Sequence, residues 1–270
     1  MLELDSVTRV FHPNTPNRLV ALDSVSLEVE KGAFVVIIGG NGSGKTTLLN
    51  AIAGSVAAES GSIRLEGSDI TRWPEHRRAH LMGRVFQNPF SGTAPNLTVE
   101  ENLALAARRG LSRGLGWGLS RRVRDELRAR IATLRMGLED RLQNPMGTLS
   151  GGQRQALTLL MATWLKPRLL LLDEHTAALD PRSADQVIRL TEEVIARERL
   201  TTLMVTHSMH QAASLGTRLL MLYRGRILHD FRGAEKRRLR PEDLLDRFED
   251  LRRSELLDET AAEMLRRMYV

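Results

Sequence analysis

Short hydrophobic runs that alternate with polar residues fill the first third of the chain, and Pro, Asn and Gly separate them. This pattern is typical of β-strands. The predicted strands of this kind are Leu2–Val7, Ser24–Glu30 and Ser62–Glu66. Ala33–Ile38 is continuously apolar and ends in glycines, as a buried strand does. A helix is predicted from Thr46, with Gly54 directly after its last residue.

Helical spacing dominates the middle of the chain, from about Gln87 to Lys166. The predicted helices are Thr98–Arg108, Arg122–Leu134 and Gly152–Leu165. Between the first two, Arg109–Leu119 is rich in Gly and Arg and is expected to be an exposed connection. Strands and helices alternate again afterwards, which predicts a parallel sheet and an α/β fold. These later elements are strands at Leu169–Leu172, Thr202–Val205 and Arg218–Tyr223 and a helix at Ser183–Ala196.

The last segment, from about Gly233, is charged and helix-forming, with a helix start at Pro241. We expect a solvated helix that packs through Leu244, Leu245, Phe248 and Leu251, and a membrane-surface or permease contact is the alternative. No apolar run approaches the roughly 20 residues that cross a bilayer. The first residues, MLELDSVTRVF, lack the basic and apolar regions of a signal peptide, so none is expected.

Composition indicates a soluble globular protein, because 42% of the 270 residues are hydrophobic and 27% are charged. The net charge is +6, and four of the 39 basic residues are lysines, so arginine dominates. This charge is spread along the chain and only 4% of residues are aromatic, which favours a solvated surface over a nucleic-acid-binding one. The absence of cysteine excludes disulfides and thiolate metal sites.

The segment Gly39–Thr46 reads GGNGSGKT and matches G-x-x-x-x-G-K-[ST] between a predicted strand and a predicted helix. Glycines let backbone N–H groups surround phosphate oxygens, and the helix N-terminus adds a partial positive charge. In this pattern Lys45 reaches the β- and γ-phosphates, and the Thr46 hydroxyl binds Mg²⁺. The predicted nucleotide-binding residues are Gly39, Asn41, Gly42, Ser43, Gly44, Lys45, Thr46 and Thr47. A glycine-rich turn is the alternative, and the strand–helix context argues against it.

Asp173 and Glu174 follow the apolar run Leu169–Leu172, so they stand at the carboxyl end of a predicted strand. Beside a phosphate loop, one such carboxylate can hold Mg²⁺ and the next can accept a proton from the attacking water. Strands often end in an acid, so the pair gains weight from its place about 125 residues after the phosphate loop, in a parallel-sheet region.

The segment Leu149–Gln153 reads LSGGQ and precedes a predicted helix. Its Ser-x-x-Gln spacing predicts a capping box, with Ser150 as the N-cap and Gln153 reaching back to it. A capped helix alone would not need two glycines, which cost up to about 1 kcal/mol each in a first turn. Bare backbone at a helix N-terminus is suited to an anion, so a phosphate site is the favoured interpretation.

These motifs resemble those of the ATP-binding-cassette (ABC) ATPases, whose signature is LSGGQ shortly before a strand that ends in Asp-Glu. The resemblance covers essentially residues 1–250. It implies a P-loop NTPase core with a mostly parallel sheet, an N-terminal antiparallel β subdomain and an inserted α-helical subdomain. The core is then expected at residues 1–86 and 167–232, the helical subdomain at 87–166 and a C-terminal helical tail at 233–270.

Cassettes of this family form head-to-tail dimers, in which each ATP lies between one subunit's phosphate loop and its partner's signature. The resemblance therefore implies that catalysis requires a second copy of the chain. It assigns Ser150, Gly151, Gly152 and Gln153 to the partner's nucleotide. ATP and Mg²⁺ are the implied cofactors, and the chain lacks the Asn-Lys-x-Asp pattern that would favour guanine.

Four further residues match family positions. Gln87 matches a glutamine that senses Mg²⁺ and the attacking water, and His207 matches a switch histidine at the γ-phosphate. Asp180 matches a loop that reaches across the dimer, and Phe11 matches an aromatic residue that stacks on adenine, with a small core role as its alternative. The implied catalytic residues are Glu174, His207 and Gln87, and the implied metal-binding residues are Thr46, Gln87 and Asp173.

Two residues depart from the family pattern. Ala177 stands where many members have Ser, and His175 follows Glu174 where Pro is common. Neither change removes a phosphate, metal or base residue, so an active ATPase is expected.

The strings LDEHTAALDP and GQRQALTLLMAT are similar to those of a bacterial subgroup that works with permeases of the branched-chain amino-acid type. The resemblance implies an importer of a small solute, with an amino acid as the candidate. Its partners would be integral membrane permease subunits and a periplasmic or lipid-anchored substrate-binding protein. The chain would then lie peripherally at the cytoplasmic face of the inner (plasma) membrane.

Three alternatives remain open at this point. An exporter cassette uses the same chemistry. A nucleic-acid-associated ABC ATPase is less favoured, because about 105 residues separate the phosphate loop from the signature and they hold no sustained heptad pattern. A non-catalytic regulatory cassette is disfavoured by the intact Lys45, Asp173, Glu174 and His207.

Overall fold

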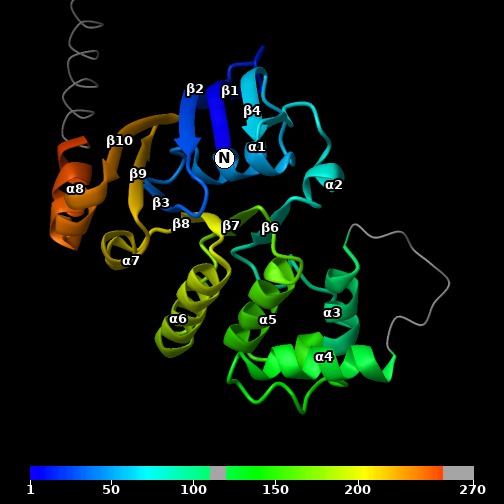
Figure 1. The fold of residues 1–270 in the computed structure, drawn as a ribbon. Coiled ribbons are helices and arrows are strands. Elements are labelled where there is room, and N and C mark those ends of the chain that lie inside the picture. Colours follow the sequence, from blue (N-terminus) through cyan, green and yellow to red (C-terminus); the bar gives the residue numbers. More distant parts are fainter. Residues whose placement is uncertain (110–119, 252–270) are drawn as a thin grey trace, which may run out of the picture.

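Two β-sheets lie at the centre of the computed structural model, which describes residues 1–109 and 120–251 (Figure 1). One is antiparallel, and its four strands stand in the order β2-β1-β4-β5. They are β1 (Leu2–Phe11), β2 (Leu19–Val29), β4 (Ser60–Leu65) and β5 (Ser68–Asp69). The other has six strands in the order β10-β9-β3-β8-β7-β6, all parallel except β10. They are β3 (Phe34–Gly39), β6 (Met82–Val85), β7 (Leu169–Asp173), β8 (Thr201–Val205), β9 (Arg218–Tyr223) and β10 (Arg226–Arg232).

Helices cover both faces of the six-stranded sheet (Figure 1). The helices of the described residues are α1 (Lys45–Ala53), α2 (Glu75–Arg78), α3 (Val99–Ala107), α4 (Arg121–Ala132), α5 (Gly151–Thr163), α6 (Pro181–Glu198), α7 (Met209–Ser214) and α8 (Gly233–Arg238). A 3₁₀ turn spans Met146–Thr148, and residues 241–251 are helical, as Pro241 predicted. The α/β architecture with an antiparallel N-terminal sheet and a mostly parallel second sheet confirms the predicted fold class. Of the predicted connection Arg109–Leu119, all but Arg109 lies outside the described residues.

Alternate residues of the parallel strands face two different hydrophobic cores. In β3, Phe34, Val36 and Ile38 join the core that contains α5 and α6. Val35 and Ile37 join the core that contains α1 and the antiparallel sheet. Because both faces are buried, these strands consist of continuous apolar runs rather than alternating ones. The molecule therefore has three layers, with the parallel sheet in the middle (Figure 1).

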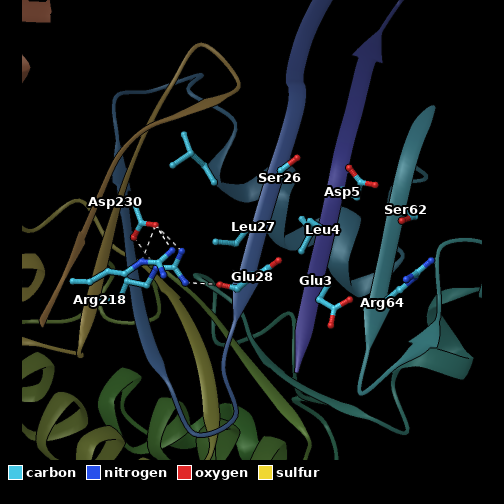
Figure 2. A pocket seen from close by; sticks show the side chains of 12 residues that line it. Glu3, Leu4, Asp5, Ser26, Leu27, Glu28, Ser62, Arg64, Arg218 and Asp230 are labelled. Carbon is cyan, nitrogen blue, oxygen red and sulfur yellow. Dashed lines mark hydrogen bonds and ion pairs between the residues drawn. The ribbon is translucent and has the colours of Figure 1, made fainter.

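Arg218 links the two sheets through hydrogen bonds (Figure 2). Its side chain is 9% exposed and makes two hydrogen bonds of 2.7 Å to the Asp230 carboxylate on β10. It also donates to the backbone carbonyl of Glu28 on β2. Burial would raise the pKa of Asp230, but the hydrogen bonds from Arg218 and Arg232 lower it to about 2. Arg218, Asp230 and Arg232 line a pocket that they share with residues of β1, β2 and β4, and this pocket holds none of the predicted site residues.

The helix ends follow the sequence signals. Gly54 adopts a left-handed conformation with φ 84° and ends α1, as predicted. Ser150 and Gln153 form the predicted capping box at α5, and Thr98 forms a second one at α3. In residues 1–109 and 120–251, the structure contains no helix that combines the length and the apolarity needed to span a bilayer.

Candidate active site

The carboxyl ends of four parallel strands bring the predicted phosphate, metal and base residues to one edge of the sheet. Asp173, the last residue of β7, is paired with Val205, the last residue of β8. Val205 is paired with Ile37 on β3, just before the phosphate loop. His207 follows β8 by two residues and Gln87 follows β6 by two residues. Such an edge is where α/β sheets bind ligands.

The phosphate loop needs its glycines for both conformation and space. Gly42 and Gly44 have φ values of +76° and +101°, in the left-handed region that favours glycine. A Cβ at Gly44 would lie 2.3 Å from the carbonyl oxygen of Ala21, and one at Gly39 would lie 2.4 Å from Ser43 Oγ. The loop is therefore wrapped tightly against β2 and against itself, and larger residues would displace it.

The loop also has features that fit a phosphate. Ser43 Oγ is buried and has no hydrogen-bond partner in the part of the chain that the structure describes. Residues Gly39–Ser43 line a cavity of about 690 Å³ together with Thr206 and His207. The loop leads into the N-terminus of α1, whose backbone N–H groups favour an anion.

Lys45 is held inside the loop. Its Nζ donates hydrogen bonds to the carbonyl oxygens of Gly39 at 2.9 Å and Gly40 at 3.0 Å. Burial lowers the pKa of Lys45, and the charges of Glu174 and Asp173 oppose that decrease. The ammonium thus lies beside the loop backbone, within the field of both acids.

The side chains of Thr46 and Asp173, which the sequence predicts as metal ligands, lie in contact. Thr46 Oγ1 donates to Asp173 Oδ1 at 3.3 Å, and Asp173 is 7% exposed. Burial raises the pKa of Asp173, and the nearby Arg84 guanidinium opposes that rise. A carboxylate and a hydroxyl next to a phosphate loop are the hard oxygen ligands that Mg²⁺ takes together with substrate phosphates, so the donor set fits this ion.

Arg84 belongs to this cluster and was not predicted from the sequence. It lies on β6, and its Nη2 is 3.7 Å from Asp173 Oδ2. The side chain is 14% exposed, and burial lowers the pKa of Arg84. A charged residue within a short apolar strand, three positions before Gln87, is the signal in the sequence that could have identified it.

Glu174 lies in a conformation that side chains other than glycine seldom adopt. Its φ is +44°, and its N–H donates to the Val205 carbonyl at 3.0 Å. This turn leaves the carboxylate 20% exposed at the strand end, with Oε2 3.5 Å from His207 Nδ1. Unusual backbone of this kind is concentrated at functional sites, where surrounding structure maintains it.

His175 is buried beneath the acids rather than directed into the site. Its Nε2 lies 3.1 Å from Thr191 Oγ1, which itself donates to the Val187 carbonyl at 2.8 Å. The Thr191 hydroxyl proton is thereby used, so the imidazole donates through Nε2. Burial lowers the pKa of His175 to about 4 and keeps the ring neutral. The residue that replaces the family's Pro therefore anchors the segment after Glu174 to α6.

The signature turn packs against the start of α6. Cβ atoms built on Gly151 and Gly152 would lie 3.1 Å from Leu179 Cδ2 and 2.8 Å from Ser183 Cβ. Asp180, the N-cap of α6, accepts a hydrogen bond from the Ser183 N–H, so it lies beside the signature. The hydrogen bonds of Ser150–Gln153 do not reach the phosphate loop of the same chain.

Gln87 is exposed, and the segment around it is attached to α5. Gln155 donates to the Phe86 carbonyl at 3.3 Å, and the Arg154 guanidinium stacks on the Phe90 ring at 3.8 Å. The strand end that carries Gln87 is thereby linked to the helix that carries the signature.

Phe11 ends β1, where it pairs with Leu19 of β2. Two residues later on β2, the Ala21 carbonyl contacts the phosphate loop, so Phe11 lies on the strand pair that flanks the loop. The Arg9 guanidinium covers one face of the Phe11 ring, 4.7 Å from its centroid. The ring is half-buried, in agreement with neither a fully buried core role nor a free surface position.

A glycine loop between β3 and α1, with its Lys and Thr next to an acid at a neighbouring strand end, defines the P-loop class of nucleotide-binding proteins. Comparison with known proteins identifies the family. The model of the ABC transporter family matches residues 22–177. The chain belongs to this family and is one of its ATP-hydrolysing cassettes, as the sequence resemblance predicted.

Two relatives and one solved structure illustrate the match. A tyrosine transport ATP-binding protein of Clostridioides difficile (strain R20291) is 41% identical, over 92% of this chain and 99% of that protein. A thiamine import ATP-binding protein of Shigella flexneri is 36% identical, over 84% of this chain and 90% of that protein. A dimeric bacterial ABC transporter cassette of known structure is 28% identical, with a TM-score of 0.72 over 86% of this chain and 98% of that one.

Proposed function

We propose that this chain is the ATP-hydrolysing motor of a membrane importer for a small solute. The observation that carries the proposal is the convergence of Lys45, the Thr46–Asp173 pair and the Glu174–His207 pair at one sheet edge. These are the groups that phosphoryl transfer to water requires. The relative named for thiamine import supports the direction of transport, and both relatives support a small solute, with an amino acid as the narrower proposal.

The phosphate loop binds the triphosphate through its backbone N–H groups and through Ser43 Oγ. Lys45 exchanges its bonds with the Gly39 and Gly40 carbonyls for the β- and γ-phosphate oxygens. Phe11 stacks on adenine with the ring face that Arg9 does not cover. Thr47 stands next to Thr46 at the N-terminus of α1, and Asn41 lines the same cavity as the loop glycines.

Thr46, Asp173 and Gln87 are the residues that would hold Mg²⁺. When bound, this ion neutralises charge on the phosphates during transfer. Glu174 orients the attacking water and accepts its proton, and the strained turn at Glu174 aims the carboxylate outward for that task. His207, 64% exposed and beside Glu174, contacts the γ-phosphate.

A second copy of the chain completes the site. The signature turn starts α5 in the layer opposite α1, and within one chain it packs on Leu179 and Ser183 rather than on the phosphate loop. Its capped, glycine-bearing helix start is suited to phosphate oxygens of another subunit's ATP. Asp180 lies beside it and would enter the same interface. The solved cassette that resembles this chain is dimeric, which supports the pairing of two copies.

A groove of about 470 Å³ is suited to the permease. It lies between the α1–α2 side of the core and helices α3 and α5, and its side chains are mostly apolar, with two arginines and Glu75 among them. They include Met82, Arg84, Phe86, Leu105, Arg109 and Met161. A short amphipathic helix from a permease would dock here, at the cytoplasmic face of the membrane. It would contact Phe86, the residue before Gln87, and so respond to the position of that segment. A periplasmic or lipid-anchored binding protein would deliver the solute to that permease.

ATP then acts as a ligand that biases two states of the dimer. Nucleotide contacts to both copies favour the closed state, and loss of the γ-phosphate contacts after hydrolysis favours the open one. The links from Gln155 to Phe86 and from Arg154 to Phe90 transmit this change to the docking groove.

Reconstitution of the chain with its permease and binding protein in vesicles tests the proposal. ATP supplied on the cassette side should drive solute from the opposite side toward the cassette, and a Lys45→Ala cassette should not. Movement of solute away from the cassette side would favour the exporter alternative. ATP hydrolysis by the Lys45→Ala protein at the wild-type rate would contradict the assigned site.

A further inference from the structure

We propose that Arg84 is a positioning residue whose fixed positive charge balances Asp173 and sets how tightly the site binds Mg²⁺. This inference rests on the proposed metal role of Thr46 and Asp173. It concerns a residue that acts through Asp173 and does not touch the nucleotide.

The two carboxylate oxygens of Asp173 have different partners. Oδ1 accepts from Thr46 at 3.3 Å, whereas Oδ2 faces Arg84 Nη2 at 3.7 Å. A separation of 3.7 Å is too long for a hydrogen bond, so Arg84 does not occupy an acceptor position that a metal would need. The contact is an ion pair, in which the guanidinium compensates a buried carboxylate without fixing its geometry.

Other groups hold Arg84 in place. Its Nη2 donates to Asn50 Oδ1 at 2.5 Å, and its Nη1 donates to Ser55 Oγ at 3.2 Å. The guanidinium also stacks on the Phe86 ring, 4.5 Å from the centroid. Asn50 lies on α1, four residues after Thr46 and hence on the same helix face. The charge is therefore anchored to the helix that carries the metal-binding hydroxyl.

The charge of Arg84 affects Asp173 differently with and without a bound metal ion. Among the described residues, Arg84 is the cation that forms an ion pair with Asp173. It compensates the carboxylate charge when no divalent ion is bound. When Mg²⁺ binds Asp173, the same charge repels the ion, because the Asn50 and Ser55 bonds keep it in place. Arg84 thus stabilises the buried Asp173 carboxylate when no metal is bound. It also weakens metal binding, so the metal can exchange between turnovers.

Binding measurements on the full chain test this inference without reliance on turnover. The experiment titrates free Mg²⁺ at pH 8 and follows the binding of a fluorescent, non-hydrolysable ATP analogue. In Arg84→Gln and Arg84→Met the half-saturating Mg²⁺ concentration should fall roughly five- to tenfold, the effect of removing one nearby unit charge from a divalent ion's surroundings. Arg84→Lys, which keeps the charge, should remain near the wild-type value.

Two controls separate this effect from general damage. Arg168→Gln removes an arginine at the other end of β7, where it pairs with Glu66, and should leave the Mg²⁺ midpoint unchanged. Binding of the analogue in EDTA should be equal in the wild type and the Arg84 variants. Equal Mg²⁺ midpoints in the wild type and both uncharged variants would overturn the inference, as would a shift in Arg84→Lys as large as in Arg84→Gln. If the wild type bound no ATP analogue with Mg²⁺, the proposed function itself would fail.

Discussion

Oε2 of Glu174 lies 3.5 Å from Nδ1 of His207, although the two residues follow different strands. The pairing of Asp173 with Val205 brings the ends of β7 and β8 level, and the left-handed turn at Glu174 aims its carboxylate at the imidazole. The proposed base and the proposed γ-phosphate contact are thereby placed side by side at the edge where the phosphate loop begins. This relationship underlies the first prediction.

Glu174→Gln should lower ATP turnover by about 100-fold or more, because it removes the proton acceptor while keeping the shape of the side chain. ATP binding should persist, and the ATP-bound dimer should accumulate. Steady-state phosphate release and size-exclusion chromatography with ATP and Mg²⁺ measure the two effects. Glu192→Gln, an exposed position on α6, is the matched control and should behave like the wild type. Turnover at the normal rate in Glu174→Gln would show that another group is the base.

Ser150→Ala should affect catalysis in addition to stability. Loss of the N-cap should destabilise the fold by about 1 kcal/mol, measured by chemical denaturation. Ser120→Ala removes the equivalent cap of α4 and should cost a similar amount. Only Ser150→Ala should lower ATP turnover, by roughly tenfold, because only that hydroxyl belongs to the proposed site for a partner's phosphate. Equal turnover in the two variants would reduce Ser150 to a helix cap.

His175 should make the folded state sensitive to mild acid. Its pKa is about 4 when folded, against an ordinary value of 6.5, so below pH 6.5 the unfolded chain binds a proton that the folded chain does not. This penalty is absent above pH 6.5, grows as the pH falls toward 4, and reaches about 3 kcal/mol there.

His175→Gln keeps a donor for Thr191 but cannot titrate. Urea unfolding from pH 7.5 to 4.5 should therefore show a shallower loss of stability in this variant than in the wild type. Identical slopes in the two proteins would mean that His175 is accessible to protons in the folded state.

Phe11→Ala should weaken ATP binding roughly tenfold, since stacking on a base contributes about 1–3 kcal/mol. Phe11→Tyr keeps the ring and should bind ATP like the wild type. Two titrations separate adenine recognition from phosphate binding. One uses a fluorescent ATP analogue, and the other uses inorganic triphosphate, which carries no base, as a competitor of that analogue. Unchanged affinity in Phe11→Ala would favour the core role for this residue.

Local signals in the sequence were sufficient for the motifs but not for every strand. The phosphate loop, the capping box at Ser150 and the end of α1 at Gly54 depend on residues close in sequence, and each formed as predicted. β1 continues to Phe11 beyond its predicted end at Val7, because bulges between Leu4 and Val10 interrupt the alternating pattern.

β6 was missed for a different reason. It has four residues, of which Gly83 is uncommon in strand interiors and Arg84 is a residue type that is mostly exposed. Gly83 is needed because a Cβ there would lie 2.4 Å from the Ala162 carbonyl of α5. Arg84 is stable there because Asn50, Ser55 and Asp173 surround its charge. These partners are distant in sequence, so no local pattern reveals them, and the burial of His175 against Thr191 is hidden in the same way.

The most direct test of the composite site uses the absence of cysteine in the chain. One copy carries Asn41→Cys in the phosphate loop, the other carries Gly151→Cys in the signature, and both carry Glu174→Gln to retain ATP. A short thiol-reactive crosslinker is added to the equal mixture. We predict a crosslinked pair of the two different copies with ATP and Mg²⁺, and little without nucleotide. Crosslinking that is absent, or equal with and without ATP, would contradict a nucleotide bound between two copies of this chain.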